Sequence, residues 1–128
     1  MREQIQKVFG IRSVESLSGL SAKGPDRITL DYLSQIIERR EKVTLLDVRT
    51  PDEHARRRIP GSIMTSVNNL QYMEEYSYEG EIVLYCTAGV RSYNASKALA
   101  ARGIKGVTDL IGGIKAWEAS GRSVESDA

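Results

Sequence analysis

The feature that most restricts the fold of this chain is a short apolar run that ends at its only cysteine. Ile82, Val83, Leu84 and Tyr85 precede Cys86, and a helical pattern begins a few residues later. A strand that is apolar on both faces is typical of a parallel sheet with helices packed on each side. In open sheets of this kind, ligands bind at the carboxyl ends of the strands. Cys86 is therefore expected at the edge of the sheet where a binding site would form.

Strand and helix patterns alternate along most of the chain. Strands separated by helices favour right-handed βαβ units, so we expect an α/β fold in which helices flank both faces of a parallel sheet of about five strands. A capping box at Thr50 and Glu53, with Pro51 between them, marks the start of one short helix. Gly103 and Gly121 are well placed to end two others. The expected strands are 28–29, 43–48, 62–65, 81–85 and 106–110, and the expected helices are 30–40, 51–57, 68–76, 91–101 and 114–120.

The chain is long enough for one domain with one hydrophobic core. We divide it into an N-terminal arm at 1–24, a domain at 25–122 and a polar tail at 123–128. The arm would pack on its own domain or, alternatively, contact a second copy of the chain or another partner. In the domain, Trp117 would pack the last helix on the sheet after a tight turn at Gly112 and Gly113. The helix at 30–40 would bury the face formed by Leu30, Leu33, Ile36 and Ile37.

Composition and charge exclude several classes of function. Lys and Arg number 18 against 17 acidic residues, so the net charge of +1 gives no sign of a nucleic-acid partner. One cysteine and one histidine exclude an internal disulfide and are too few for a Cys/His zinc site, so we expect neither a metal nor a cofactor. No apolar stretch approaches the ~20 residues that a membrane-spanning helix needs. The first residues lack a signal-peptide core, so a cytoplasmic protein is expected.

The segment from Cys86 to Ser92 suits a reactive thiol. The first N–H groups of the helix that follows have no partner within the helix and can face an anion. Together with Arg91 they would lower the pKa of the Cys86 thiol and supply a nucleophile at neutral pH. Gly89 would let the loop amides converge on the sulfur. The alternative is that Cys86 is a small buried apolar residue, as many free cysteines are.

Four segments of the chain carry a family resemblance. They are Leu-Leu-Asp-Val-Arg at 45–49 followed by Glu53, Ile-Pro-Gly-Ser-Ile at 59–63, Val-Leu-Tyr-Cys at 83–86 with the loop through Arg91 and Ser92, and Asp-Leu-Ile-Gly-Gly-Ile-Lys-Ala-Trp at 109–117. In this order and spacing they resemble the signatures of single-domain rhodaneses, a family of sulfurtransferases. The resemblance runs from about residue 28 to residue 121, and it implies a rhodanese-like fold.

The resemblance also implies a reaction. A donor such as thiosulfate or polysulfide would give a sulfur atom to Cys86, the catalytic residue, and form a persulfide that a thiol or a protein acceptor removes. Because the chain has no second cysteine, the sulfur must leave to another molecule. The expected substrate-binding residues are Thr87, Ala88, Gly89, Val90, Arg91 and Arg49, and the expected supporting residues are Asp47, Arg58 and Ser92.

Several side chains around this loop have more specific expectations. Asp47 would form a hydrogen-bond network rather than act as an acid or base, and Arg49 would line the mouth of the pocket. Arg58 would pair with Glu53. His54 is expected to be a plain surface residue. Arg56 and Arg57 would form either a solvated face or a positive rim that attracts anionic donors. The loop at 87–91 contains no acidic residue, so no carboxylate is expected near the sulfur, and the Thr87 hydroxyl could donate to it.

Two other classes of function stay open from the sequence. One is a rhodanese-like binding or regulatory module without turnover, whose usual mark is the loss of the cysteine. The other is a phosphatase of the Cdc25 type, which separates its cysteine and arginine by five residues. Here only four residues lie between Cys86 and Arg91, which favours the smaller sulfur atom over a phosphate.

Overall fold

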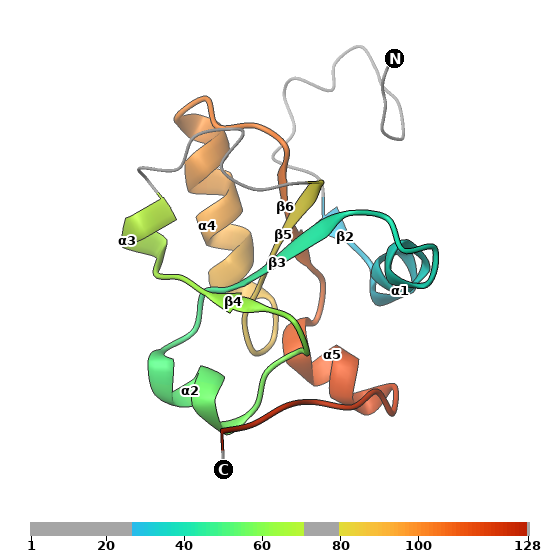
Figure 1. Ribbon diagram of the computed structural model, residues 1–128. Helices are drawn as coiled ribbons and strands as arrows, with labels where there is room; N and C mark the ends of the chain where they lie inside the picture. The colour runs from blue at the N-terminus through green and yellow to red at the C-terminus, as the bar shows by residue number, and fades with distance from the viewer. Residues whose placement is uncertain (1–26, 71–79, 128) are drawn as a thin grey trace.

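A computed structural model describes residues 27–70 and 80–127 of the chain. Five strands form one sheet in the order β2-β6-β5-β3-β4, and every pair is parallel (Figure 1). The expected α/β fold with a parallel sheet is confirmed. The N-terminal arm, and with it the expectation of an oligomer contact, lies outside the described residues. The strands are β2 (Arg27–Ile28), β3 (Val43–Asp47), β4 (Ile63–Met64), β5 (Glu81–Tyr85) and β6 (Val107–Leu110).

The helices follow the expected positions closely. They are α1 (Leu30–Glu38), α2 (Pro51–Arg56), α3 (Val67–Leu70), α4 (Val90–Ala101) and α5 (Gly113–Ala119). The expected helix at 68–76 starts at α3, and its part beyond Leu70 lies outside the described residues. None of the helices in the described part of the chain is long and apolar enough to cross a bilayer.

Two hydrophobic cores lie on opposite faces of the sheet because the side chains of β5 alternate. Val83 and Tyr85 pack against one face with α1 and α5, in a cluster that includes Leu33 and Trp117. Ile82, Leu84 and Cys86 pack on the other face with α3 and α4, in a cluster that includes Leu70, Ala95 and Leu99. Figure 1 shows α4 on one side of the sheet, with α1 and α5 on the other. The run 82–85 is at most 4 % exposed, as expected of a strand covered on both faces.

Local sequence signals fix the helix ends near the site. The Thr50 side chain accepts a hydrogen bond from the Glu53 N–H, and the Glu53 carboxylate accepts one from the Thr50 N–H, which completes the expected capping box. Gly103 adopts a φ of +86° just after α4, and Gly121 one of +87° just after α5. The buried face predicted for α1 is wrong at one position, because Ile37 is 39 % exposed.

The turn before α5 ties this helix to the loop that follows β5. Gly112 and Gly113 have φ angles of +81° and +58°. The N–H of Ile114 donates to the carbonyl of Cys86 at 2.9 Å, and the N–H of Lys115 donates to the carbonyl of Thr87 at 3.0 Å. A Cβ atom on Gly113 would contact the Cys86 carbonyl oxygen and lie 2.6 Å from that of Thr87. The glycine at position 113 therefore allows α5 to approach the loop closely enough to hold its carbonyl groups.

Replacing Gly113 with alanine should therefore destabilise the fold by about 3 kcal/mol or more, since it combines a left-handed backbone with a clash against backbone atoms. The matched control is Gly103→Ala, where φ is +86° but a Cβ meets nothing within 4 Å. The control should lose only about 1 kcal/mol. Urea unfolding of both variants provides the comparison. Equal losses would show that the contact with the loop does not restrict position 113.

Candidate active site at the carboxyl end of β5

Cys86 lies directly after β5, and its side chain is almost fully buried at 1 % exposure. The backbone N–H of Gly89 donates to the Cys86 Sγ at 3.2 Å, and that of Ser92 donates at 3.4 Å. The Ser92 hydroxyl oxygen lies 3.5 Å from the same sulfur. The loop thus curls around the sulfur and presents hydrogen-bonding groups to it. This arrangement suits a sulfur atom that carries negative charge.

The curl of the loop depends on glycine at position 89. Gly89 has a φ of +97° and is the N-cap residue of α4. A Cβ atom there would lie 3.0 Å from the Gly112 backbone nitrogen and 3.1 Å from the Arg27 Nη2. Both the backbone conformation and the close packing therefore require glycine. Ala88 and Val90 on either side are exposed, and Val90 is 66 % exposed.

The surroundings of Cys86 lower the pKa of its thiol from the ordinary value of 9.0. Burial alone would raise the pKa, because it disfavours the charged thiolate. Hydrogen bonds from the Ser92 side chain and from the backbone N–H groups of Ser92, Gly89 and Arg91 outweigh that effect. The loop therefore favours a thiolate mainly through backbone and hydroxyl dipoles.

A buried chain of hydrogen bonds supports the loop from the neighbouring strands. The Ser92 hydroxyl donates to Asp109 Oδ2 at 3.0 Å, and Asp109 is fully buried on β6. The Arg27 guanidinium, from β2, donates to both carboxylate oxygens of Asp109 at 2.9 Å. It also donates to the Gly89 carbonyl at 2.9 Å. No local pattern in the sequence identifies Arg27 or the Asp109 carboxylate as part of the site, because their contacts join strands that are distant in the chain.

The second carboxylate near the loop comes from α2. Arg91 makes a two-pronged ion pair with Glu53, at 3.0 and 3.1 Å, and also donates to the Thr87 hydroxyl at 3.0 Å. The Thr87 hydroxyl donates to Glu53 at 3.2 Å, so its proton does not point to the sulfur. The loop itself contains no acidic residue, but the fold brings Glu53 to it from 38 residues away in the chain. There the Glu53 carboxylate contacts Arg91 and Thr87.

This ion pair has a clear consequence for the titration of Glu53. The hydrogen bond from Arg91, with those from Thr50, lowers the pKa of Glu53 from 4.5 to about 2. The carboxylate therefore stays charged, and neutralises Arg91, throughout the neutral range. A lowered pKa stabilises the fold above the unfolded value of 4.5, and that stabilisation is lost as the pH falls toward about 2.

Asp47 forms the expected network on the opposite face of the sheet. Its carboxylate accepts from the Arg49 Nε at 2.9 Å and Nη2 at 2.8 Å, and from the Tyr85 hydroxyl at 3.1 Å. It also lies 2.8 Å from the His54 Nδ1. Burial raises the pKa of Asp47, but the hydrogen bonds from Arg49 and His54 more than offset this and lower it overall. The interpretation of His54 as a plain surface residue is wrong, because its side chain is 17 % exposed and contacts this network.

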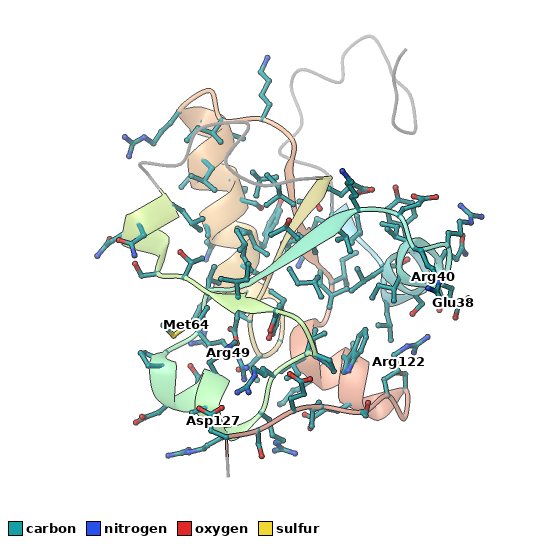
Figure 2. The ribbon with its side chains drawn as sticks, in the orientation of Figure 1. Glu38, Arg40, Arg49, Met64, Arg122 and Asp127 are labelled. Carbon is teal, nitrogen blue, oxygen red and sulfur yellow. The ribbon has the colours of Figure 1, made fainter. Side chains whose placement is uncertain are left out.

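The structure does not place the Arg49 and Arg58 side chains where the sequence suggested. The Arg49 guanidinium is 5 % exposed and also donates to the Arg57 carbonyl, so it is already occupied inside the fold rather than open at a pocket mouth (Figure 2). Arg58 does not pair with Glu53, whose partner is Arg91. Arg58 instead pairs with Asp127 at 2.8 Å, and its backbone forms an antiparallel β-bridge with Glu125. These contacts, with the hydrogen bond from the Asp127 N–H to the Ala55 carbonyl, hold the C-terminal tail against α2. Its partner could not be foreseen because the tail returns from the end of the chain.

Among residues 27–70 and 80–127, no group of three or more histidine, cysteine, aspartate or glutamate side chains could hold a metal ion. At the loop, the backbone N–H groups of Gly89 and Ser92 polarise the Cys86 sulfur.

Neutralisation of Arg91 by Glu53 predicts a measurable change in charge selectivity at Cys86. Glu53→Gln keeps the helix cap, since glutamine also accepts from the Thr50 N–H, but removes the negative charge. The variant should raise the ratio of alkylation rates for anionic iodoacetate over neutral iodoacetamide by roughly fivefold at low salt. Using this ratio cancels any change in the thiolate fraction. Glu118→Gln, which removes the partner of Arg57 instead, is the control and should leave the ratio unchanged. An unchanged ratio in Glu53→Gln would contradict the masking of Arg91.

Comparisons with known proteins agree with this geometry. The Rhodanese-like domain family matches residues 29–120. A protein of Allochromatium vinosum named Sulfurtransferase is 36 % identical over 97 residues, which cover 75 % of this chain and 91 % of that protein. Thiosulfate sulfurtransferase GlpE of Pseudoalteromonas translucida is 32 % identical over 82 residues, 63 % of this chain and 78 % of that protein.

A solved structure from Rhodopseudomonas palustris, described as a protein of unknown function and possible tyrosine phosphatase, superposes with a TM-score of 0.67 at 27 % identity. The match covers 79 % of this chain and 85 % of that one. The family match begins directly after β2 and spans the other four strands and the helices from α1 to α5, including Cys86 and its loop. The chain therefore belongs to the rhodanese-like domain family.

Proposed function

We propose that this protein is a sulfurtransferase that carries a sulfur atom on Cys86 as a persulfide. The observation that carries the proposal is the convergence of the Gly89 N–H and the Ser92 N–H on one buried sulfur, with the Ser92 hydroxyl beside it. Such donors stabilise the Cys86 thiolate, which is the nucleophile that the proposed reaction needs. The names of the relatives, a sulfurtransferase and a thiosulfate sulfurtransferase, support the same reaction class.

The proposed reaction has two balanced steps. In the first, the Cys86 thiolate attacks the outer sulfur of thiosulfate, the S–S bond of thiosulfate breaks, and sulfite leaves with the bonding electron pair. In the second, a thiophilic acceptor attacks the outer sulfur of the persulfide, and the Cys86 thiolate leaves with the electron pair. No net oxidation of the protein occurs. The acceptor is an external thiol or protein, because Cys86 is the only cysteine in the chain.

The residues around Cys86 take complementary roles in this proposal. The amides of the loop 87–91 and Ser92 hold the sulfur anion, and Asp109 with Arg27 supports Ser92 from below. Arg91 supplies a positive charge at the entrance, where Glu53 partly neutralises it. Thiosulfate and polysulfide are both small anions that could reach this charge, which leaves the choice of donor to experiment. The substrate-binding role of Arg49 stays a prediction, with its donors engaged by Asp47 and Arg57.

A phosphatase is the second candidate because the superposed structure from Rhodopseudomonas palustris is described as a possible tyrosine phosphatase. Phosphate transfer to a cysteine needs an arginine that clamps two oxygens of the phosphate. Here the Arg91 fork is occupied by Glu53, and only four residues separate it from Cys86. Both observations favour sulfur transfer.

The test is the formation of thiocyanate from thiosulfate and cyanide, measured beside hydrolysis of p-nitrophenyl phosphate. Wild type should form thiocyanate and hydrolyse no phosphate, and Cys86→Ser should lose thiocyanate formation by at least about a thousandfold, because the thiolate is the nucleophile. The first-step rate should rise with pH with its midpoint below pH 9, since the pKa of Cys86 is lowered from 9.0. Retained transfer in Cys86→Ser, or phosphate hydrolysis in its place, would refute the proposal. If the protein shows neither activity, with thiosulfate or with polysulfide as the donor, the alternative of a rhodanese-like binding or regulatory module without turnover would be favoured.

A further inference from the structure

Arg27 contacts two residues connected to the Cys86 sulfur, although it lies on a different strand. They are Gly89, whose N–H donates to the sulfur, and Asp109, which accepts from the Ser92 hydroxyl. Its guanidinium donates to the Gly89 carbonyl and to both carboxylate oxygens of Asp109, all at 2.9 Å. The ring of Tyr93 stacks against it, with its centroid 4.4 Å from the guanidinium carbon. The side chain is therefore fixed by three elements: β6, the loop after β5, and α4.

The first of these contacts orients a donor to the sulfur directly. Gly89 uses its N–H to bond the Cys86 Sγ and its carbonyl to accept from Arg27. Its left-handed backbone, at a φ of +97°, has no side chain to restrain it. Because the restraint comes from Arg27, loss of this hydrogen bond would free the Gly89 N–H to turn away from the sulfur.

The second contact decides where the single proton of the Ser92 hydroxyl points. In the structure Ser92 donates to Asp109, and the Cys86 thiol can donate to the Ser92 oxygen in turn. A Cys86 thiolate instead needs the Ser92 proton for itself, so the thiolate and Asp109 compete for it. Arg27 satisfies both oxygens of Asp109 and weakens the hold of this carboxylate on Ser92. When Cys86 ionises and its proton passes to solvent, the hydroxyl can rotate to the sulfur.

We propose that Arg27 is a positioning residue for the reactive sulfur, which it controls through the Gly89 carbonyl and through the Asp109–Ser92 pair. The inference deepens the proposed function and rests on the use of Cys86 as a nucleophile. Arg27 touches neither the sulfur nor a substrate in this account. Its guanidinium shape matters as much as its charge, because a planar fork can hold a carboxylate side-on and a carbonyl at the same time.

The other charged groups around Cys86 act from different directions. Arg91 on α4 and Glu53 on α2 neutralise each other at the loop entrance. Lys97 on α4 faces the Tyr93 ring, at 4.7 Å from its centroid, beside Arg27. From α5 the loop receives the backbone N–H groups of Ile114 and Lys115. Of these groups, Asp109 and Arg27 are the pair connected to the sulfur through a hydroxyl.

The test is the pH dependence of Cys86 alkylation by iodoacetamide, which reads one thiol because the chain has one cysteine. Arg27→Lys keeps the positive charge beside Asp109, but a lysine cannot hold both the Asp109 carboxylate and the Gly89 carbonyl. The midpoint of its plot of alkylation rate against pH should therefore rise by about 0.5 pH unit or more. Arg27→Gln should shift the midpoint further in the same direction. Because Arg27→Gln leaves a buried unpaired carboxylate that can prevent folding, Arg27→Lys decides the question where the glutamine variant does not fold. Arg39→Gln, an exposed arginine paired with Glu41, controls for net charge.

A raised midpoint in Arg27→Lys with an unchanged midpoint in Arg39→Gln would support the positioning role. A midpoint in Arg27→Lys equal to that of wild type would overturn it, because charge alone would then suffice. An equal shift in Arg39→Gln would overturn it as well. Since alkylation needs no sulfur donor, this result stands apart from the test of sulfur transfer. Failure to transfer sulfur from thiosulfate, polysulfide and a protein persulfide would refute the proposed function and leave the alkylation result valid.

Discussion

The burial of a sulfur atom at the end of β5 is the constraint on which the rest of the site depends. A thiolate in an apolar interior is unfavourable unless hydrogen-bond donors replace the lost water. Here the donors are the backbone N–H groups of Gly89 and Ser92. They converge because Gly89 takes a left-handed conformation and because the Gly113 turn lets α5 hold the carbonyls of Cys86 and Thr87 from the other side. The packing of α5 and the stabilisation of a thiolate therefore depend on the same backbone conformation of this loop.

Charge around the loop is balanced in pairs rather than concentrated on the sulfur. Arg91 and Glu53 neutralise each other at the surface. Arg27 on β2 and the buried Asp109 on β6 form a second such pair. A third cluster around Asp47 holds Arg49 and His54 on the face where Tyr85 packs. The consequence is that the sulfur is stabilised by short-range dipoles, while fixed charges position those dipoles.

The fold and the place of Cys86 at the end of a buried strand could be predicted from the sequence because their signals are local. The apolar run 82–85 identifies the buried strand, the capping box identifies α2, and the glycines mark the turns. The partners of charged residues could not be predicted, since they depend on which strands become neighbours. Arg27 meets Asp109 from 82 residues away because β2 pairs with β6, and Glu53 meets Arg91 from 38 residues away. For the same reason the partner of Arg58 and the surroundings of His54 were predicted wrongly.

The measurement that tests the account most directly is the intact mass of the reduced protein after mixing with thiosulfate and then with cyanide. The account predicts a gain of one sulfur atom in wild type, its removal by cyanide, and no gain in Cys86→Ser. A mass that does not change with thiosulfate, polysulfide or a protein persulfide would contradict it, as would a gain that persists in Cys86→Ser. Either result would mean that the donors around the sulfur do not serve to hold a persulfide.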